Sequence, residues 1–144
     1  MTLVPSQFYD DSCAGEYLAQ VVDKLSPEEV HSVYLKDWEA YCVFQGEEPV
    51  LCRMLQSLAS FEEYNKISCC LENGRLSLAI AQGRSLLLAN SYACSDFTSA
   101  LYYILLAMKS LQLNPEVSTV CFSSPLEEEQ SMLLYHYFKA VKQL

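Results

Sequence analysis

Histidines, acids and thiols are the side chains that most often perform chemistry, and here they lie along the chain without a clear partner. His31 and His136 have no acid or thiol at a telling spacing, whereas a general base needs a group that positions it. The glutamates at residues 127–129 invite a metal site. Neighbouring helical residues diverge by about 100°, so these carboxylates do not converge on one ion and instead complement the helix macrodipole. The sequence predicts no catalytic residue and no metal site.

The cysteines form no recognisable metal or redox motif. Neither a CxxC motif nor a Cys/His pair at zinc spacing occurs, and most of the thiols fall within apolar patterns. We therefore expect buried free thiols in a reducing cytoplasm. The seven cysteines are Cys13, Cys42, Cys52, Cys69, Cys70, Cys94 and Cys121.

The charge balance is acidic, since 18 acidic and 9 basic residues give a net charge of −9. Nucleic-acid binding requires clustered lysine and arginine, and no apolar run has the length of a membrane span. We expect a cytoplasmic protein that binds neither nucleic acid nor membrane. No linker-like composition divides the 144 residues, so residues 1–144 are predicted to form one domain.

Residues 66–113 organise the predicted fold as three strands joined by tight turns, followed by a long helix. Asn73 and Gly74 lie between two alternating runs, which is the strongest short hairpin signal because a type I′ turn needs positive φ at both central residues. A two-residue turn pairs Glu72 with Arg75. The third strand, residues 85–92, is apolar on both faces, as expected of a covered strand.

The helix after the third strand is capped by Ser95 or Asp96 and ends at Asn114 and Pro115. Residues 117–122 then form a short strand, whose helical crossover predicts parallel pairing. A final helix is expected to begin at Ser124 and to reach Val141.

The first part of the chain is predicted to be a smaller α/β segment, residues 1–63, before a core in residues 64–144. A helix over residues 13–25 is capped by Ser12. Two strands follow at residues 30–35 and 39–44. A second helix begins at residues 47–48 and carries a leucine stripe: Leu51, Leu55 and Leu58.

Several short motifs carry a family resemblance that covers nearly the whole chain. They are Thr2-Leu3-Val4-Pro5-Ser6-Gln7-Phe8, Asn90-Ser91, Ser95-Asp96-Phe97, Ala100-Leu101-Tyr102-Tyr103-Ile104-Leu105 and Leu111-Gln112-Leu113-Asn114-Pro115. As a set they resemble an uncharacterised bacterial family with an actin-like ATPase fold. In that family the first motif follows an N-terminal lobe, so this chain resembles the C-terminal portion. The segment between residues 44 and 66 is shorter than in the family.

The resemblance implies an α/β fold with a mixed sheet around an actin-like, ribonuclease-H-like core. Three antiparallel meander strands, a helix, a strand and a helix would follow one another, with the sheet order third-second-first-fourth. Actin-like enzymes hold nucleotide phosphates on hairpins that carry an aspartate and glycines, and they hold the adenosine near a Gly-Gly segment.

The resemblance places the candidate nucleotide-binding residues at Asn73, Gly74 and Arg75, and at Ser123 and Ser124. The hairpin has Glu72 and no aspartate. Pro125 follows the two serines, so it removes an N–H from a segment that already leads into three glutamates. We therefore expect neither ATP nor Mg²⁺ as a cofactor.

The leading hypothesis is a non-catalytic actin-like scaffold or protein-interaction domain of a bacterial cytoplasm. The alternative is one half of an ATP-binding actin-like protein. A third class, a hydrolase with a ribonuclease-H-like metal site, finds only Glu72 on the first strand. We also expect a protein partner or self-association, most simply a two-fold homodimer through residues 2–5 and the apolar third strand.

Overall fold

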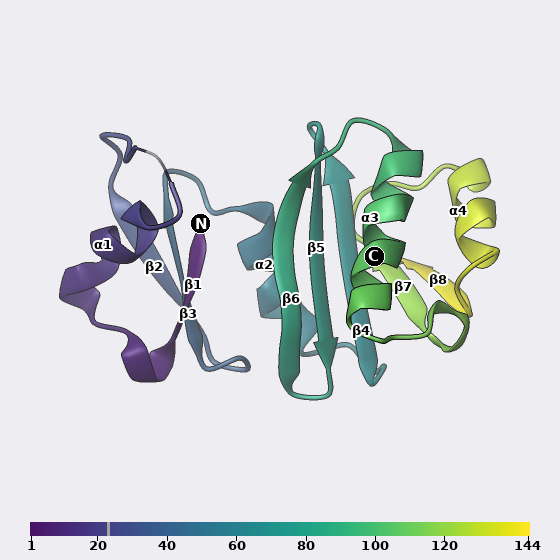
Figure 1. Cartoon of the computed structure of the whole chain (residues 1–144), viewed down its shortest axis with the longest axis horizontal. Coiled ribbons are helices and arrows are strands. Elements are labelled where there is room, and N and C mark those ends of the chain that lie inside the picture. Colours follow the sequence, from purple (N-terminus) through teal and green to yellow (C-terminus); the bar gives the residue numbers. More distant parts are fainter. Residues whose placement is uncertain (23) are drawn as a thin grey trace. The chain divides into compact units, whose positions relative to one another are not determined.

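The computed structural model describes residues 1–22 and 24–144. The chain folds into two compact units, Met1–Gln56 and Ser57–Leu144 (Figure 1). The single domain and its division after residue 63 stay predictions.

The first unit is built on an antiparallel sheet in the order β1-β3-β2. Its strands are β1 (Thr2–Pro5), β2 (Val30–Leu35) and β3 (Ala40–Gln45). The pair of strands expected around residues 36–38 is confirmed, and Glu39 takes part in their turn with a φ of 49°. Val4, Leu18 and Val43 form the core of this unit.

Helix α1 (Ala14–Ala19) is shorter than predicted. The expected helix over residues 13–25 is wrong beyond Ala19, where Val21 and Leu25 of its apolar stripe are exposed, although Val22 still packs against the core. Position 23 of that prediction lies outside the described residues. The cap also differs, since no side chain caps α1 and Asp10 caps the preceding 3-10 turn.

Helix α2 (Val50–Leu58) begins two to three residues later than predicted. The carbonyl oxygen of Pro49 accepts from the N–H of Cys52 at 3.1 Å, so the proline precedes the helix and does not lie in its first turn. The expected stripe of Leu51, Leu55 and Leu58 is confirmed as buried.

The second unit holds a mixed five-stranded sheet in the order β6-β5-β4-β7-β8. Strands β4 (Asn65–Glu72) and β5 (Arg75–Gln82) form the predicted hairpin, and Glu72 pairs with Arg75 as expected. Asn73 and Gly74 have φ values of 53° and 72°. This register confirms the organising prediction, because positive φ at both positions is what a type I′ turn requires.

Strand β6 (Ser85–Ala93) is the edge of this sheet, in agreement with the expected strand order. The expectation of a covered strand is wrong: all of its residues are half-buried or exposed, and Leu87 is 36% exposed. Its register with β5 shifts between Ile80 and Ala81, which makes Leu87 a bulged residue. The apolar run therefore lies at the edge strand of the second unit's sheet.

Helix α3 (Phe97–Ser110) begins at one of the two predicted caps, where Asp96 Oδ1 accepts from the N–H of Ser99 at 2.7 Å. It ends in a left-handed turn at Gln112, whose φ is 59°, rather than at Asn114. Strand β7 (Thr119–Phe122) then pairs parallel with β4, as predicted.

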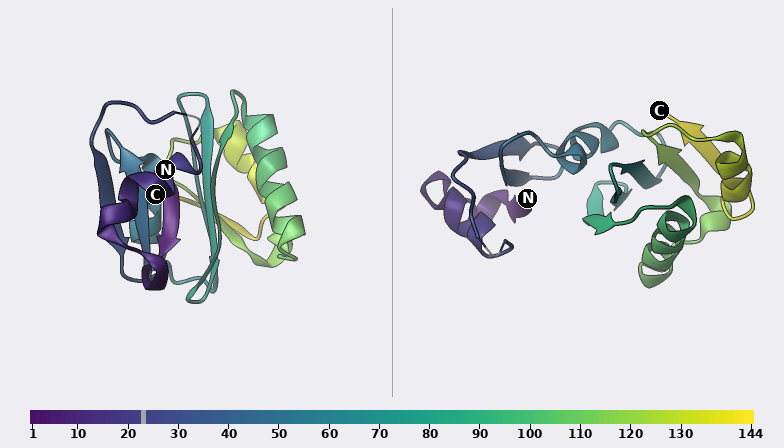
Figure 2. Two further views of the ribbon diagram at one scale, coloured as in Figure 1. Left: turned by 60° about the vertical axis from the view of Figure 1, so that its left-hand side comes forward. Right: turned by 90° about the horizontal axis from the view of Figure 1, so that it is seen from above.

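Helices α3 and α4 lie on the same face of the sheet (Figure 2). The face of β4, β5 and β7 below them is apolar and fully buried, which builds the core of the second unit. This core includes Ile67, Leu76, Leu78, Ile80, Ile104, Met108, Val120, Phe122 and Leu134.

The end of the chain departs from the prediction of one long final helix. Helix α4 (Glu128–Tyr135) begins later than Ser124 and stops early, and strand β8 (Ala140–Gln143) pairs parallel with β7. The N–H of Lys139 donates to the carbonyl of Ser118 at 3.0 Å and turns the chain towards β7. The free edge of β7 satisfies the backbone groups of residues 140–143, and this tertiary pairing overrides the local helical spacing.

Candidate functional site

The two candidate segments lie next to each other at the carboxyl ends of strands β4 and β7. Because β4 and β7 are parallel, with Cys69 beside Phe122, both strands end at the same side. The turn at residues 73–74 follows β4, and residues 123–124 follow β7. Ligands of open α/β sheets bind at the carboxyl ends of strands. The structure thus brings together segments that lie about fifty residues apart and leaves them where a ligand would bind.

Both serines make hydrogen bonds to the backbone of β4. Ser124 is 3% exposed, and its Oγ accepts a hydrogen bond from the N–H of Leu71 at 2.9 Å. The N–H of Ser123 donates to the carbonyl of Cys69 at 2.9 Å and extends the β4–β7 ladder by one bond. Ser123 itself is exposed, with its Oγ 3.4 Å from the same carbonyl. Neither backbone nor hydroxyl groups form an open cradle for a phosphate.

Gln143 of β8 fastens the loop that contains these serines. Its Nε2 donates to the carbonyl oxygens of Phe122 at 2.9 Å and Ser124 at 2.8 Å. Its Oε1 accepts from the N–H of Leu126 at 2.8 Å. No sequence signal pointed to Gln143, because the end of the chain was expected to be helical. These bonds hold the β7–α4 loop closed over its own polar groups.

Arg75, the basic candidate on the hairpin, points along the sheet to β6. Its Nε donates to Ser91 Oγ at 2.9 Å, and its guanidinium also donates to the Ser91 carbonyl at 3.3 Å. The carbonyl of Gly74 accepts from the N–H of Cys94 at 2.9 Å. The positive charge is therefore engaged within the sheet, and Asn73 remains at an exposed turn.

The Cys70 thiol lies close to both candidate segments, near Ser123, Ser124 and Glu72. Burial raises the pKa of the Cys70 thiol; hydrogen bonds from Ser123 and Ser124 oppose that rise, and the nearby Glu72 carboxylate adds to it. The thiol therefore stays protonated at neutral pH and is a poor nucleophile.

The amino terminus of α4 adds further negative charge next to the β7–α4 loop. Glu128 and Glu129 lie in its first turn, and Gln130 Oε1 accepts from the N–H of Glu127 at 2.9 Å. Helix amino termini attract anions when their N–H groups are free. Here the carboxylates already complement the dipole. Among the described residues, no group of three or more His, Cys, Asp and Glu side chains could hold a metal ion.

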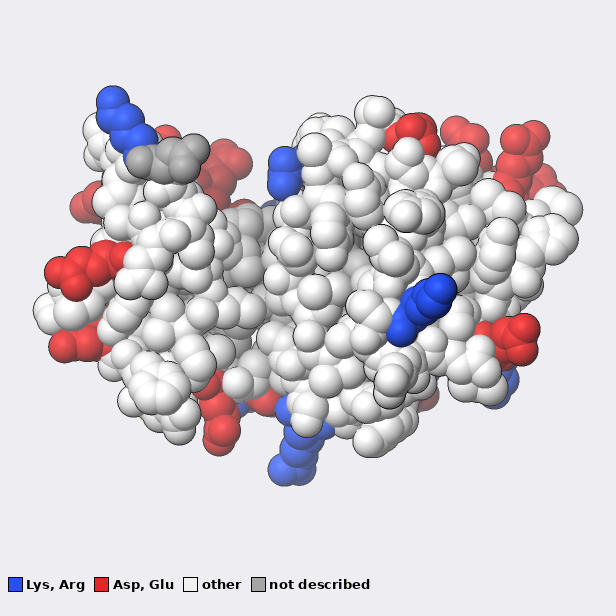
Figure 3. Space-filling view, viewed as in Figure 1, with Lys and Arg blue, Asp and Glu red and all other residues white. Residues whose placement is uncertain are grey.

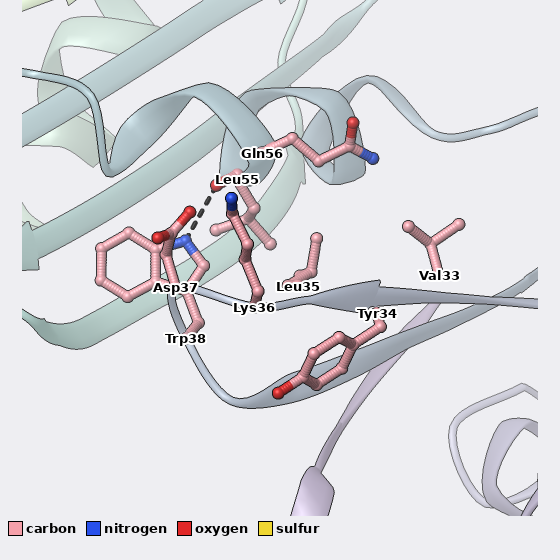
Figure 4. Close-up of a pocket in the computed structure, with 8 residues that line it drawn as sticks. All are labelled: Val33, Tyr34, Leu35, Lys36, Asp37, Trp38, Leu55 and Gln56. Carbon is pink, nitrogen blue, oxygen red and sulfur yellow. Dashed lines mark hydrogen bonds between the residues drawn. The ribbon is translucent and has the colours of Figure 1, made fainter.

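The first unit contains a small pocket beside the β2–β3 turn (Figure 4). Its volume is about 240 Å³, below the usual range of ligand sites, about 300–1,000 Å³. Trp38 Nε1 donates to the Leu55 carbonyl at 2.8 Å and fixes α2 to the turn. Its lining residues do not include an acidic and a basic side chain paired as a catalytic acid and base would be. The lining residues are Val33, Tyr34, Leu35, Lys36, Asp37, Trp38, Leu55 and Gln56.

The remaining reactive side chains of the sequence lie apart. His31 is on β2, with its ring 5.7 Å from that of Phe44, and His136 follows α4. Cys42 and Cys52 are buried and joined by a thiol hydrogen bond, which raises the pKa of Cys42 and lowers that of Cys52. All seven cysteines are free thiols in the described part of the chain.

The fold defines the class of protein. Three meander strands, a crossover helix and a parallel strand follow one another in the sheet order expected of an actin-like core. The chain is similar to a crystal structure from Bacteroides thetaiotaomicron, described as a protein with actin-like ATPase fold and unknown function. The TM-score is 0.77 at 17% sequence identity. The expected actin-like fold is confirmed.

The family follows from the sequence. The model of the family described as "Protein of unknown function (DUF3822)" matches residues 47–141, and the chain belongs to that family. The likeness to the Bacteroides structure covers 99% of this chain and 64% of that one. No curated protein matches the chain. In the described residues no helix combines the length and apolar character needed to cross a bilayer.

Proposed function

We propose that this chain is a non-catalytic, actin-like protein-interaction domain. The observation that carries the proposal is an apolar and aromatic face formed by α3 and β6, on which Tyr102 and Leu106 are exposed and the other members are half-buried. We call it the α3–β6 face; it comprises Leu88 and Tyr92 of β6 and Tyr102, Tyr103 and Leu106 of α3.

The α3–β6 face contrasts with the charge of the whole chain. The net charge is −9, yet α3 has no acidic residue and a single lysine, Lys109, and β6 has no charged residue. Tyr102 is 62% exposed and Leu106 is 48% exposed. Figure 3 shows a largely uncharged surface over β6 and α3. Large exposed apolar patches on soluble proteins mark interaction sites.

Aromatic packing gives the α3–β6 face a rigid surface. The rings of Tyr92 and Tyr103 stack with centroids 5.0 Å apart, and Tyr102 lies edge-on to Tyr103 at 6.0 Å. Interfaces are enriched in tyrosine, which offers a large contact area at low entropy cost. These rings therefore support a binding role more than a packing role alone.

The hydrogen bonds at the carboxyl ends of β4 and β7 support the absence of a nucleotide cofactor. The Ser124 hydroxyl is bonded to Leu71, Arg75 is bonded to Ser91, and glutamates surround the β7–α4 loop. Binding of ATP would require breaking these bonds and overcoming like-charge repulsion. The buried free thiols favour a reducing compartment, so the proposed location is a bacterial cytoplasm.

A second candidate function, one half of an ATP-binding actin-like protein, is favoured by one observation. The hairpin turn and residues 123–124 lie together at the carboxyl ends of β4 and β7, where such folds bind ligands. Calorimetric titration of the protein with Mg-ATP separates the two. The interaction domain predicts no saturable heat, whereas saturable binding with a micromolar Kd would establish the second candidate and overturn the first.

A further inference from the structure

We infer that the partner of the α3–β6 face is a second copy of this chain, which pairs edge to edge through β6 and joins two sheets into one. The inference rests on the proposed interaction function and names its partner. In this assembly a two-fold axis runs perpendicular to the sheet, the two β6 strands are antiparallel, and the two α3 helices pack beside each other.

The edge of β6 is suited to strand pairing. One side of the strand is bonded to β5, and in the sheet order of the second unit its other side has no neighbouring strand. Proteins usually protect such edges with lysine, proline or short length. Residues 88–93 contain neither charge nor proline, and they follow the bulge at Leu87 in regular register. The opposite edge, β8, has only four residues and carries Lys142.

The two-fold axis brings matching side chains together. In an antiparallel pair, residues opposite each other point to the same face of the sheet. An axis at Asn90 therefore places Leu88 opposite Tyr92 of the second copy, on the face that α3 covers. Aromatic and aliphatic cross-strand pairs of this kind stabilise sheets.

Helix α3 presents a compatible flank next to β6. Because Tyr103 stacks on Tyr92, the α3 residues three or four positions from Tyr103 lie on the β6 side of the helix. These are Ser99, Ala100, Leu106 and Ala107, all uncharged; Ser110, a further turn along the same side, is uncharged too. Lys109, three positions from Leu106, is the one charged residue of α3, and because it is exposed its ammonium group can stay in water at the rim of such a contact, so no unpaired charge need be buried.

Charge selects a second copy over a basic partner. A two-fold contact places each charge near its own equivalent, so an acidic chain repels itself through most of its surface. The α3–β6 face reduces this penalty because α3 and β6 contain no carboxylate side chain, and the carboxylate of Asp96 at the start of α3 is engaged by the N–H and hydroxyl of Ser99. For the same reason this face offers a basic protein no opposite charge to recognise.

The test is the mass of the protein in solution over a concentration series, with a matched pair of variants. We expect the mass to rise from 16.3 kDa towards twice that value. Leu106→Glu should weaken association at least about tenfold, because it places two like charges at the contact. Met132→Glu is the control, since Met132 is a 61% exposed apolar residue of α4; it should leave association unchanged. Tyr102→Glu serves as a second variant if Leu106→Glu does not fold.

A mass of 16.3 kDa at every concentration would overturn the inference. A dimer that Leu106→Glu and Tyr102→Glu leave intact would also overturn it, because its interface would lie elsewhere. Neither result bears on nucleotide binding, so the Mg-ATP titration tests the proposed function independently of the dimer.

Discussion

Replacement of Ser124 by alanine separates a structural serine from a ligand-binding one. In the structure the Ser124 Oγ accepts from the N–H of Leu71 at 2.9 Å, at a residue only 3% exposed. Ser124→Ala leaves that donor without a partner at the end of β4. An unsatisfied buried donor costs about 1–3 kcal/mol, and little cavity is created because only one oxygen is removed. We expect a loss of about 1–2 kcal/mol in the free energy of unfolding.

The neighbouring serine is a matched control for this experiment. Ser123 is exposed, and its Oγ makes only a long contact of 3.4 Å with the Cys69 carbonyl. Ser123→Ala should therefore change stability by less than about 0.5 kcal/mol. Urea unfolding measures both variants; with an unchanged slope of about 2 kcal/mol/M, Ser124→Ala lowers the midpoint by roughly 0.5–1 M. Equal midpoints for the two variants, or no loss in Ser124→Ala, would refute the structural role.

Two further variants test the hairpin and an ion pair. Gly74 has a φ of 72°, and a β-carbon at this position would meet no other atom within 4 Å, so Gly74→Val should cost about 1–2 kcal/mol through backbone strain alone; unchanged thermal stability would contradict the type I′ turn. The hydrogen bond from Lys142 holds the pKa of the Glu63 carboxyl below its usual value. This pair therefore stabilises the fold above the ordinary glutamate pKa, and the contribution is lost as the pH falls through the lowered value. Glu63→Gln should cost about 0.5 kcal/mol at pH 7, and this cost should shrink as the pH falls through the lowered pKa; a loss in urea unfolding that stays constant as the pH falls would exclude the ion pair as its cause.

Local chemistry made the β4–β5 hairpin predictable from sequence. Asn73 and Gly74 determine the turn type, and alternation on both sides determines the register, since a slip by one residue would move every apolar side chain to the wrong face. The helix cap at Asp96 was predictable for the same reason, because a cap acts within three residues.

The end of the chain could not be predicted because its structure depends on tertiary pairing. Tyr137, Phe138 and Val141 fit a helical spacing, but residues 140–143 pair with β7. With that strand missed, Gln143 could not be recognised as the side chain that fastens the β7–α4 loop. The family resemblance pointed to residues 123–124, yet only the parallel register shows that Ser124 contacts Leu71 and that Ser123 contacts Cys69.

Amide hydrogen exchange, measured segment by segment at low and high protein concentration and with and without Mg-ATP, tests the central claim most directly. We predict slower exchange at high concentration in residues 88–93 and in α3, where the α3–β6 face is covered. We predict that Mg-ATP leaves the exchange rates of residues 72–75 and 123–130 unchanged, because the polar groups of these segments are bonded within the protein. Protection of those two segments by Mg-ATP, together with no concentration dependence in β6 and α3, would contradict the account and assign the chain to the nucleotide-binding members of the fold.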